Sequence, residues 1–252
     1  MTALGAGLAL LVGFVLGLLG GGGSVLMVPI LVYILGVPVK LAIATSLLIV
    51  GLVALIGCLS HLRRGNVAPK VALVFGAFAA AAAFAGARLA AYIPEDAQLI
   101  LFAVVGLAGS VLMLRGTSHA GAGSEAAYEF SASVRTIALL ALQGEGVGLL
   151  TGIIGVGGGF LIVPALVVVA GLPMRLAIGT SLLVIAMNAM SGFAGYIGSV
   201  AIDWSLVLWF TAFAGAASVA GTALGARLPQ RRLKQMFGYL LIAVSLYVLY
   251  RR

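Results

Sequence analysis

Long stretches without a charged residue fill most of the chain. They cover residues 1–39, 41–60, 71–87, 97–114, 146–174, 176–202 and 204–226. Apolar runs of roughly 18 residues or more are typical of transmembrane helices. Because lipid offers the backbone no hydrogen-bond partner, a spanning segment must be a helix or part of a closed barrel, and these runs lack the alternation of barrel strands. The pattern predicts an all-α, polytopic membrane protein.

The sequence contains an internal repeat with a constant offset of 135 residues. Residues 17–50 align with residues 152–185 without a gap, and 18 of the 34 aligned positions are identical. The same offset continues through more divergent segments, where Gly86 falls on Gly221 and Pro94 falls on Pro229. We therefore expect two copies of one helical unit.

Each copy is predicted to contain a long helix, a glycine-rich break, a short apolar segment, a Gly-x-Pro turn and three further helices. In the first copy, residues 1–115, the helical segments are expected at 3–19, 24–35, 39–62, 67–92 and 97–115. In the second copy, residues 134–252, they are expected at 134–154, 159–170, 174–199, 204–227 and 233–250. Residues 116–133 are small, polar and unpatterned, so they are predicted to be a linker.

Basic residues in the loops indicate how the two copies are oriented. The loop after the third segment carries Arg63, Arg64 and Lys70 in the first copy, but only Asp203 in the second. One loop later, the second copy carries Arg227, Arg231, Arg232 and Lys234. Because cytoplasmic loops are enriched in Lys and Arg, this exchange predicts two inverted repeats of five transmembrane segments each. The alternative is that the short second segments are re-entrant, which leaves eight full spans.

Composition and charge exclude several classes of function. Hydrophobic residues make up 63% of the chain and charged residues 8%, against about a quarter in soluble domains. The formal net charge of +8 does not indicate nucleic-acid binding, because the basic residues lie in short loops where they set topology and contact anionic lipids. The two histidines and the single Cys58 form no metal-ligand or catalytic pattern. We expect no enzyme activity, no metal and no cofactor.

Two glycine clusters lie at matching positions before the short segments. The first comprises Gly20 to Gly23 and the adjoining Ser24, with Gly20, Gly22, Gly23 and Ser24 as candidate binding residues, and the second comprises Gly155, Gly157, Gly158 and Gly159. Adjacent glycines free backbone N–H groups and let a ligand approach the main chain, and a helix that begins there adds about half a positive charge from its dipole. The Lys of a nucleotide-binding P-loop is missing from both clusters. The clusters predict a site for a small anion near the bilayer midplane.

Hydroxyl pairs form a second duplicated feature. They are Thr45 with Ser46 and Thr180 with Ser181, two turns into the third helix of each copy. Such hydroxyls either donate to the substrate or bond to their own helix backbone. Lys40 and Arg175, at the starts of the same helices, either attract anions or extend to lipid headgroups.

The glycine clusters are joined by two Val-Pro dipeptides and two Ala-x-x-Thr-Ser stretches, so that the whole motif is doubled. In these features the chain resembles the TauE/SafE family of sulfite and organosulfonate exporters, over nearly its whole length. The resemblance implies a secondary transporter of a small anion, such as sulfite, a sulfonate or a related organic acid, in a bacterial cytoplasmic (inner) membrane. Members differ in substrate, so the resemblance does not identify the anion.

Unpaired polar residues are candidates for coupling transport to an ion gradient, with H⁺ as the candidate ion. They are Gln143 and Glu145 in the first helix of the second copy, and Asn188 in its third helix. Ionisable residues within spans are functional candidates, although Glu145 near an interface would simply be solvated. A passive anion channel and a thiol-handling assembly factor that uses Cys58 are the alternatives to a transporter. Besides the anion, the lipid bilayer and a second copy of the chain are the expected partners.

Overall fold

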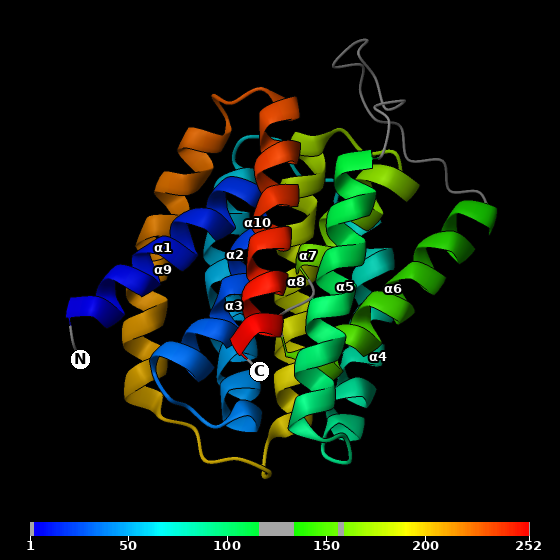
Figure 1. Ribbon diagram of the computed structural model, residues 1–252. Helices are drawn as coiled ribbons and strands as arrows, with labels where there is room; N and C mark the ends of the chain where they lie inside the picture. Colours follow the sequence, from blue (N-terminus) through cyan, green and yellow to red (C-terminus); the bar gives the residue numbers. More distant parts are fainter. Residues whose placement is uncertain (1–2, 116–133, 156–158, 252) are drawn as a thin grey trace.

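The computed structural model describes residues 3–115, 134–155 and 159–251, so the predicted linker 116–133 lies outside the described residues. All the elements in the described residues are helical (Figure 1). The first copy contains α1 (Ala3–Leu19), α2 (Gly22–Pro29), η1 (Ile30–Ile34), α3 (Val39–Leu62), α4 (Pro69–Ala90) and α5 (Glu95–Arg115). The second contains α6 (Val134–Ile154), α7 (Gly159–Pro164), η2 (Ala165–Val169), α8 (Met174–Tyr196), α9 (Trp204–Gly225) and α10 (Gln230–Arg251).

Seven of the described helices are long and apolar enough to cross a membrane, namely α3, α4, α5, α6, α8, α9 and α10. Shorter apolar helices lie at Leu4–Leu19 and Gly22–Ile34. The all-α, polytopic membrane prediction is therefore confirmed. The predicted bounds of α1, α3 and α6 agree with the structure, and those of the other long helices differ by two or three residues.

The short segments differ from the prediction in their helical form. Each begins as an α-helix and changes to a π-helix directly after a proline, Pro29 in η1 and Pro164 in η2. Proline has no N–H and clashes with the preceding turn, which favours a wider turn at that point. The segments end at Gly36 (φ +68°) and Gly171 (φ +70°), a left-handed conformation that glycine adopts without strain.

The first helix of each copy packs against the fourth helix of the other copy. Helix α1 packs along α9, and α6 packs along α4. Small residues allow these close contacts, because a Cβ on Gly13 would overlap the backbone of Ala214, and a Cβ on Gly148 would overlap that of Ala79. Both contacts are related by the 135-residue offset. Close helix packing thus accounts for isolated glycines such as Gly13.

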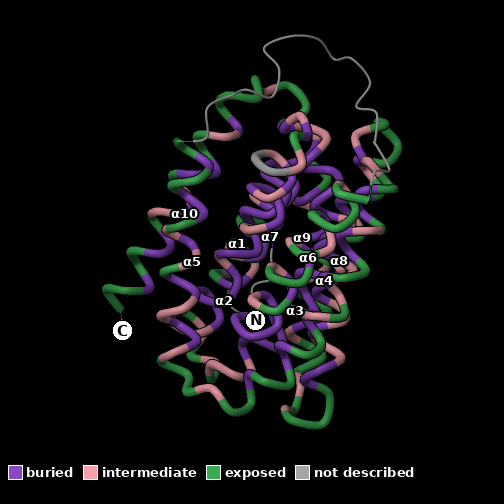
Figure 2. Tube along the Cα trace, turned by 90° about the vertical axis from the view of Figure 1, so that its right-hand side faces the viewer, coloured by how far each residue is buried: buried purple, intermediate pink, exposed green. Residues whose placement is uncertain are grey.

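Equivalent helices of the two copies run antiparallel. Gly51 of α3 lies against Ala189 and Met190 of α8, whereas Gly57 lies against Leu182. Helices α5 and α10 likewise stand side by side and run in opposite directions (Figure 1). This arrangement is compatible with an inverted repeat, whose orientation across a bilayer stays a prediction. Helices α3 and α8 are the most buried of the long helices, and buried residues gather in the interior of the bundle (Figure 2).

Candidate functional site

The two glycine clusters meet in the interior of the protein. A Cβ on Gly21 would overlap the backbone of Gly159, and a Cβ on Gly159 would lie within 3.0 Å of the Gly21 carbonyl oxygen. Helix α2 begins at Gly22 without a side-chain cap, and α7 begins at Gly159. The positive ends of two short helices are therefore held together, an arrangement that an anion between them would stabilise.

Gly20 and Gly155 make matching contacts with the opposite copy. Both adopt a left-handed conformation, with φ of +74° and +78°. A Cβ on Gly20 would lie 2.8 Å from Ser181 Oγ and 3.1 Å from Ile178 Cα, while a Cβ on Gly155 would lie 2.9 Å from Ile43 Cα. Each cluster thus rests on the third helix of the other copy, and no larger residue fits these positions without movement of a helix.

The other described residues of the first cluster pack closely against neighbouring side chains and backbone. A Cβ on Gly22 would lie 3.1 Å from the side chain of Leu19 and 3.2 Å from that of Leu240, whereas one on Gly23 would overlap the backbone of α1. Buried Ser24 donates a hydrogen bond of 2.7 Å to the Gly21 carbonyl oxygen. Gly157 and Gly158 lie outside the described residues. Close packing therefore accounts for the small size of several cluster residues, and Gly22 is the least constrained.

The serines of the hydroxyl pairs bond to backbone carbonyls. Ser46 donates to the carbonyl oxygen of Ile43, at 2.8 Å, and also lies against that of Gly155. Ser181 donates to the carbonyl oxygen of Ile178 at 2.8 Å. The Thr180 hydroxyl accepts a bond of 2.9 Å from the Ala68 N–H, and Thr45 is buried. The serines thus take the backbone-bonding alternative while remaining beside the glycines.

Asn188 is the most informative polar residue near the clusters. Its side chain is fully buried, and neither its amide nitrogen nor its amide oxygen has a hydrogen-bond partner. It lies on the same face of α8 as Ser181 and Ile185, which precede it by seven and three residues. Those two residues contact Gly20 and Gly159. A buried amide without partners is costly, so its position beside the clusters indicates a polar ligand.

The other two coupling candidates do not lie at the clusters. Glu145 is exposed on the outer surface of α6, in a groove that it shares with Phe78 and Ala81 of α4. It also precedes Gly155 by ten residues, or about 15 Å of helix. Gln143 is half-buried, and its Oε1 atom has no hydrogen-bond partner. Of the three candidates, the structure therefore brings only Asn188 close to the glycines.

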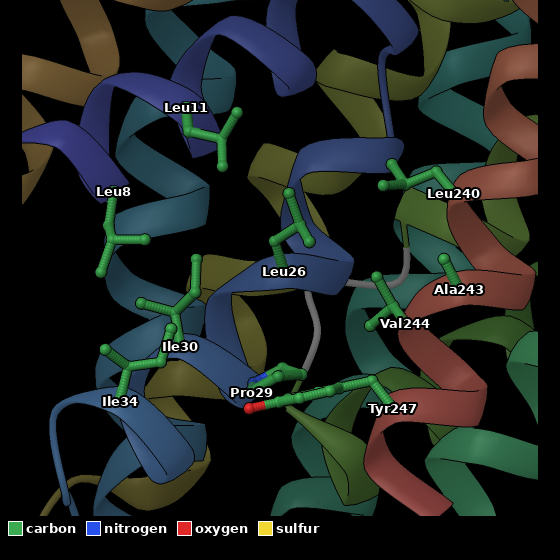
Figure 3. A pocket seen from close by; sticks show the side chains of 10 residues that line it. All are labelled: Leu8, Leu11, Leu26, Pro29, Ile30, Ile34, Leu240, Ala243, Val244 and Tyr247. Carbon is green, nitrogen blue, oxygen red and sulfur yellow. The ribbon is translucent and has the colours of Figure 1, made fainter. Parts of the chain in front are cut away.

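Other hollows and reactive groups fit an anion less well. The groove in Figure 3 has a volume of about 310 Å³, and its labelled side chains are apolar apart from the Tyr247 hydroxyl. It lies between α1, the short helix α2 and α10, where lipid would meet the protein. Cys58 is buried, and the described residues contain no group of His, Cys, Asp or Glu able to hold a metal.

Comparison with known proteins identifies the family of the chain. The family model "Sulfite exporter TauE/SafE" matches residues 5–248. The chain belongs to the TauE/SafE family. It is 34% identical to a "Probable membrane transporter protein" of Xylella fastidiosa, over 96% of the chain and 92% of the relative. It is 31% identical to the "Probable membrane transporter protein YdhB" of Bacillus subtilis, over 79% and 80% of the two chains. No solved structure matches it significantly. The chain is a multi-pass membrane transporter.

Reasoning from the sequence missed Tyr196 and its relation to His61. Tyr196 donates a hydrogen bond of 3.1 Å to the Gly152 carbonyl oxygen, one turn before the second cluster. The 135-residue offset places His61 at the equivalent position of the first copy, where it is buried near the end of α3. The 135-residue offset relates His61 to Tyr196, but the two residues differ in type. A search for identical residues in the two copies therefore does not find them.

Proposed function

We propose that this TauE/SafE protein is a secondary transporter that exports a small anion across a bacterial inner membrane. Sulfite, a sulfonate or a related organic acid is the substrate class, which the description of the matching family supports. The anion binds where α2 and α7 begin, near the middle of the bilayer. The observation that carries the proposal is the contact between Gly21 and Gly159, which joins two helix N-termini beside the unpartnered amide of Asn188.

The site uses no formal charge to bind its substrate. Main-chain N–H groups at the two helix starts donate hydrogen bonds to the anion, and the aligned helix dipoles stabilise its negative charge. The Asn188 N–H₂ group supplies two further donors. An empty site without a charged side chain buries no unpaired charge, so its desolvation costs little free energy. After releasing the anion, the protein can therefore return to its starting conformation without carrying a buried charge through the membrane.

Flux through proteoliposomes tests the proposal. Labelled sulfite should accumulate against its gradient when a pH difference is imposed, and sulfonates should compete with sulfite for transport. Gly22→Ala should lower the flux, because the new methyl group would lie 3.1 Å from the Leu19 side chain and 3.2 Å from that of Leu240 and would shift the start of α2, whose amides bind the anion. Gly146→Ala is the matched control, since a Cβ on Gly146 meets no atom within 4 Å.

Two results would contradict the proposal. Equal flux in Gly22→Ala and Gly146→Ala, with both proteins folded, would show that the helix starts at the glycine clusters do not bind the anion. Flux that only follows the anion's own gradient, whatever pH difference is imposed, would identify a passive channel instead of a secondary transporter.

A further inference from the structure

Two hollows lie at opposite ends of the central helices. The first has a volume of about 400 Å³ and is lined by residues that include Lys40, Arg88, Tyr196 and Ser199. The second has a volume of only about 10 Å³ and is lined by residues that include His61, Asn66 and Arg175. Lys40 and His61 are separated by 21 residues of the continuous helix α3, which is about 30 Å, the thickness of a bilayer core.

The repeat relates the two hollows to one another. The offset of 135 residues places Arg175 on Lys40, Tyr196 on His61 and Ala226 on Ala91. All three pairs have one member in each hollow. The hollows are therefore the same feature of the fold, formed once by each copy, although they differ in volume.

Each hollow adjoins one glycine cluster. Tyr196, in the larger hollow, donates to the Gly152 carbonyl oxygen, three residues before Gly155. Ile178, in the smaller hollow, lies beside Gly20, since a Cβ on Gly20 would be 3.1 Å from both its Cα atom and its carbonyl oxygen. A solute that passed the Tyr196 ring or the His61 ring would reach the proposed anion site.

Hydrogen bonds hold the region of the smaller hollow together. Arg64 Nη1 donates to the Thr222 carbonyl oxygen at 3.2 Å and ties the end of α3 to α9. The Met174 N–H donates to Gln230 Oε1 at 3.1 Å and ties the start of α8 to α10. The residue of the second copy that is equivalent to Arg64 is Ser199, whose short side chain cannot reach as far. At the larger hollow, the flexible Lys40 side chain instead donates to the Ala91 carbonyl oxygen at 3.2 Å.

We propose that the two hollows are the entrances of one anion pathway, and that this structure has the Lys40–Arg88 entrance open and the His61–Arg175 entrance closed. Tyr196 and His61 are the equivalent gate residues, and the Arg64 bond holds the closed gate. The basic side chains attract the anion to each entrance. The inference rests on the proposed function, because it supplies the route to the glycine site.

Thiol labelling tests which entrance is open. In a Cys58→Ala background, Tyr196→Cys and His61→Cys place one thiol in each gate. The protein is held in lipid nanodiscs, where both faces meet solvent, and is treated with methanethiosulfonate ethylsulfonate, a small anionic reagent. Tyr196→Cys should react about tenfold faster or more, as a strong preference for one arrangement requires. Ser199→Cys and Asn66→Cys, which leave both rings in place, should show the same order.

Equal rates at the two gates, or faster labelling of His61→Cys, would overturn the assignment. Arg64→Gln should raise the labelling rate of His61→Cys several-fold. An unchanged rate would show that the Arg64 bond does not hold the gate closed. Tyr196→Cys protein labelled with N-ethylmaleimide, whose thioether sulfite does not cleave, should lose most of its sulfite flux in proteoliposomes, and full flux would show that the hollow is not an entrance. Failure of the proposed function is distinct, because it appears as absent flux in the unlabelled protein.

Discussion

Replacing Asn188 with leucine should stabilise the protein and damage transport at once. The amide carries two donors and an acceptor oxygen, none of which is paired, in a fully buried position of α8. A buried polar group without partners costs about 1–3 kcal/mol. Leucine has the same branched shape without the polar atoms, so Asn188→Leu should raise the free energy of unfolding by about 1 kcal/mol or more, after some loss from the larger methyl groups.

The same substitution removes an amide that we assign to the anion site. A hydrogen bond to a charged group contributes about 1.5–3 kcal/mol. Its loss should lower kcat/KM for sulfite flux by about 10- to 150-fold. A purely structural asparagine would behave differently, because a more stable protein would then transport at least as well as the original.

Thermal unfolding in detergent and flux in proteoliposomes are measured on the same preparation. Val53→Leu is the matched control, because Val53 is the buried residue of α3 at the equivalent position and has no polar group. It should leave flux nearly unchanged. If Asn188→Leu is more stable and transports within about twofold of the original protein, the amide does not contact the substrate and the reasoning is refuted.

Three further substitutions test the packing around the site. Gly21→Ala should prevent correct folding, seen as loss of a monodisperse peak in size-exclusion chromatography, because its Cβ would overlap the Gly159 backbone; a folded variant would contradict the contact. Thr180→Val should lower stability by about 1–3 kcal/mol, measured by thermal unfolding, because the Ala68 N–H loses its acceptor; unchanged stability would argue against this bond. Tyr196→Phe should cost only about 0.5–1.5 kcal/mol, since one neutral hydrogen bond to Gly152 is lost, and a larger loss would show that the hydroxyl has another role.

The sequence predicts the helices of this protein well. Charge-free runs define the spans, and the turns at Gly36 and Gly171 are visible as Gly-x-Pro in each copy. It does not predict which helices pair. The long helices are apolar on nearly all sides, so they carry no hydrophobic stripe that identifies a partner, and the exchange of α1 and α6 between the copies depends on close backbone contacts.

The candidate site was predicted in part. The clusters were identified because adjacent glycines are unusual in a membrane segment, and the structure shows that the first cluster lies against the second. Sequence reasoning favoured Glu145, because an ionisable residue within a span is a functional candidate, whereas Asn188 could simply bond a neighbouring helix. Only the fold shows that Glu145 faces outward and that Asn188 is buried beside the glycines.

The most direct test of the account is a crystal structure of the protein soaked with selenite, a sulfite analogue whose selenium gives an anomalous signal. We predict one anomalous peak within hydrogen-bonding distance of the Gly22 and Gly159 main-chain nitrogens and of the Asn188 amide. A selenite peak elsewhere in the protein, with these three groups packed against one another and the transport of selenite intact, would contradict the central claim.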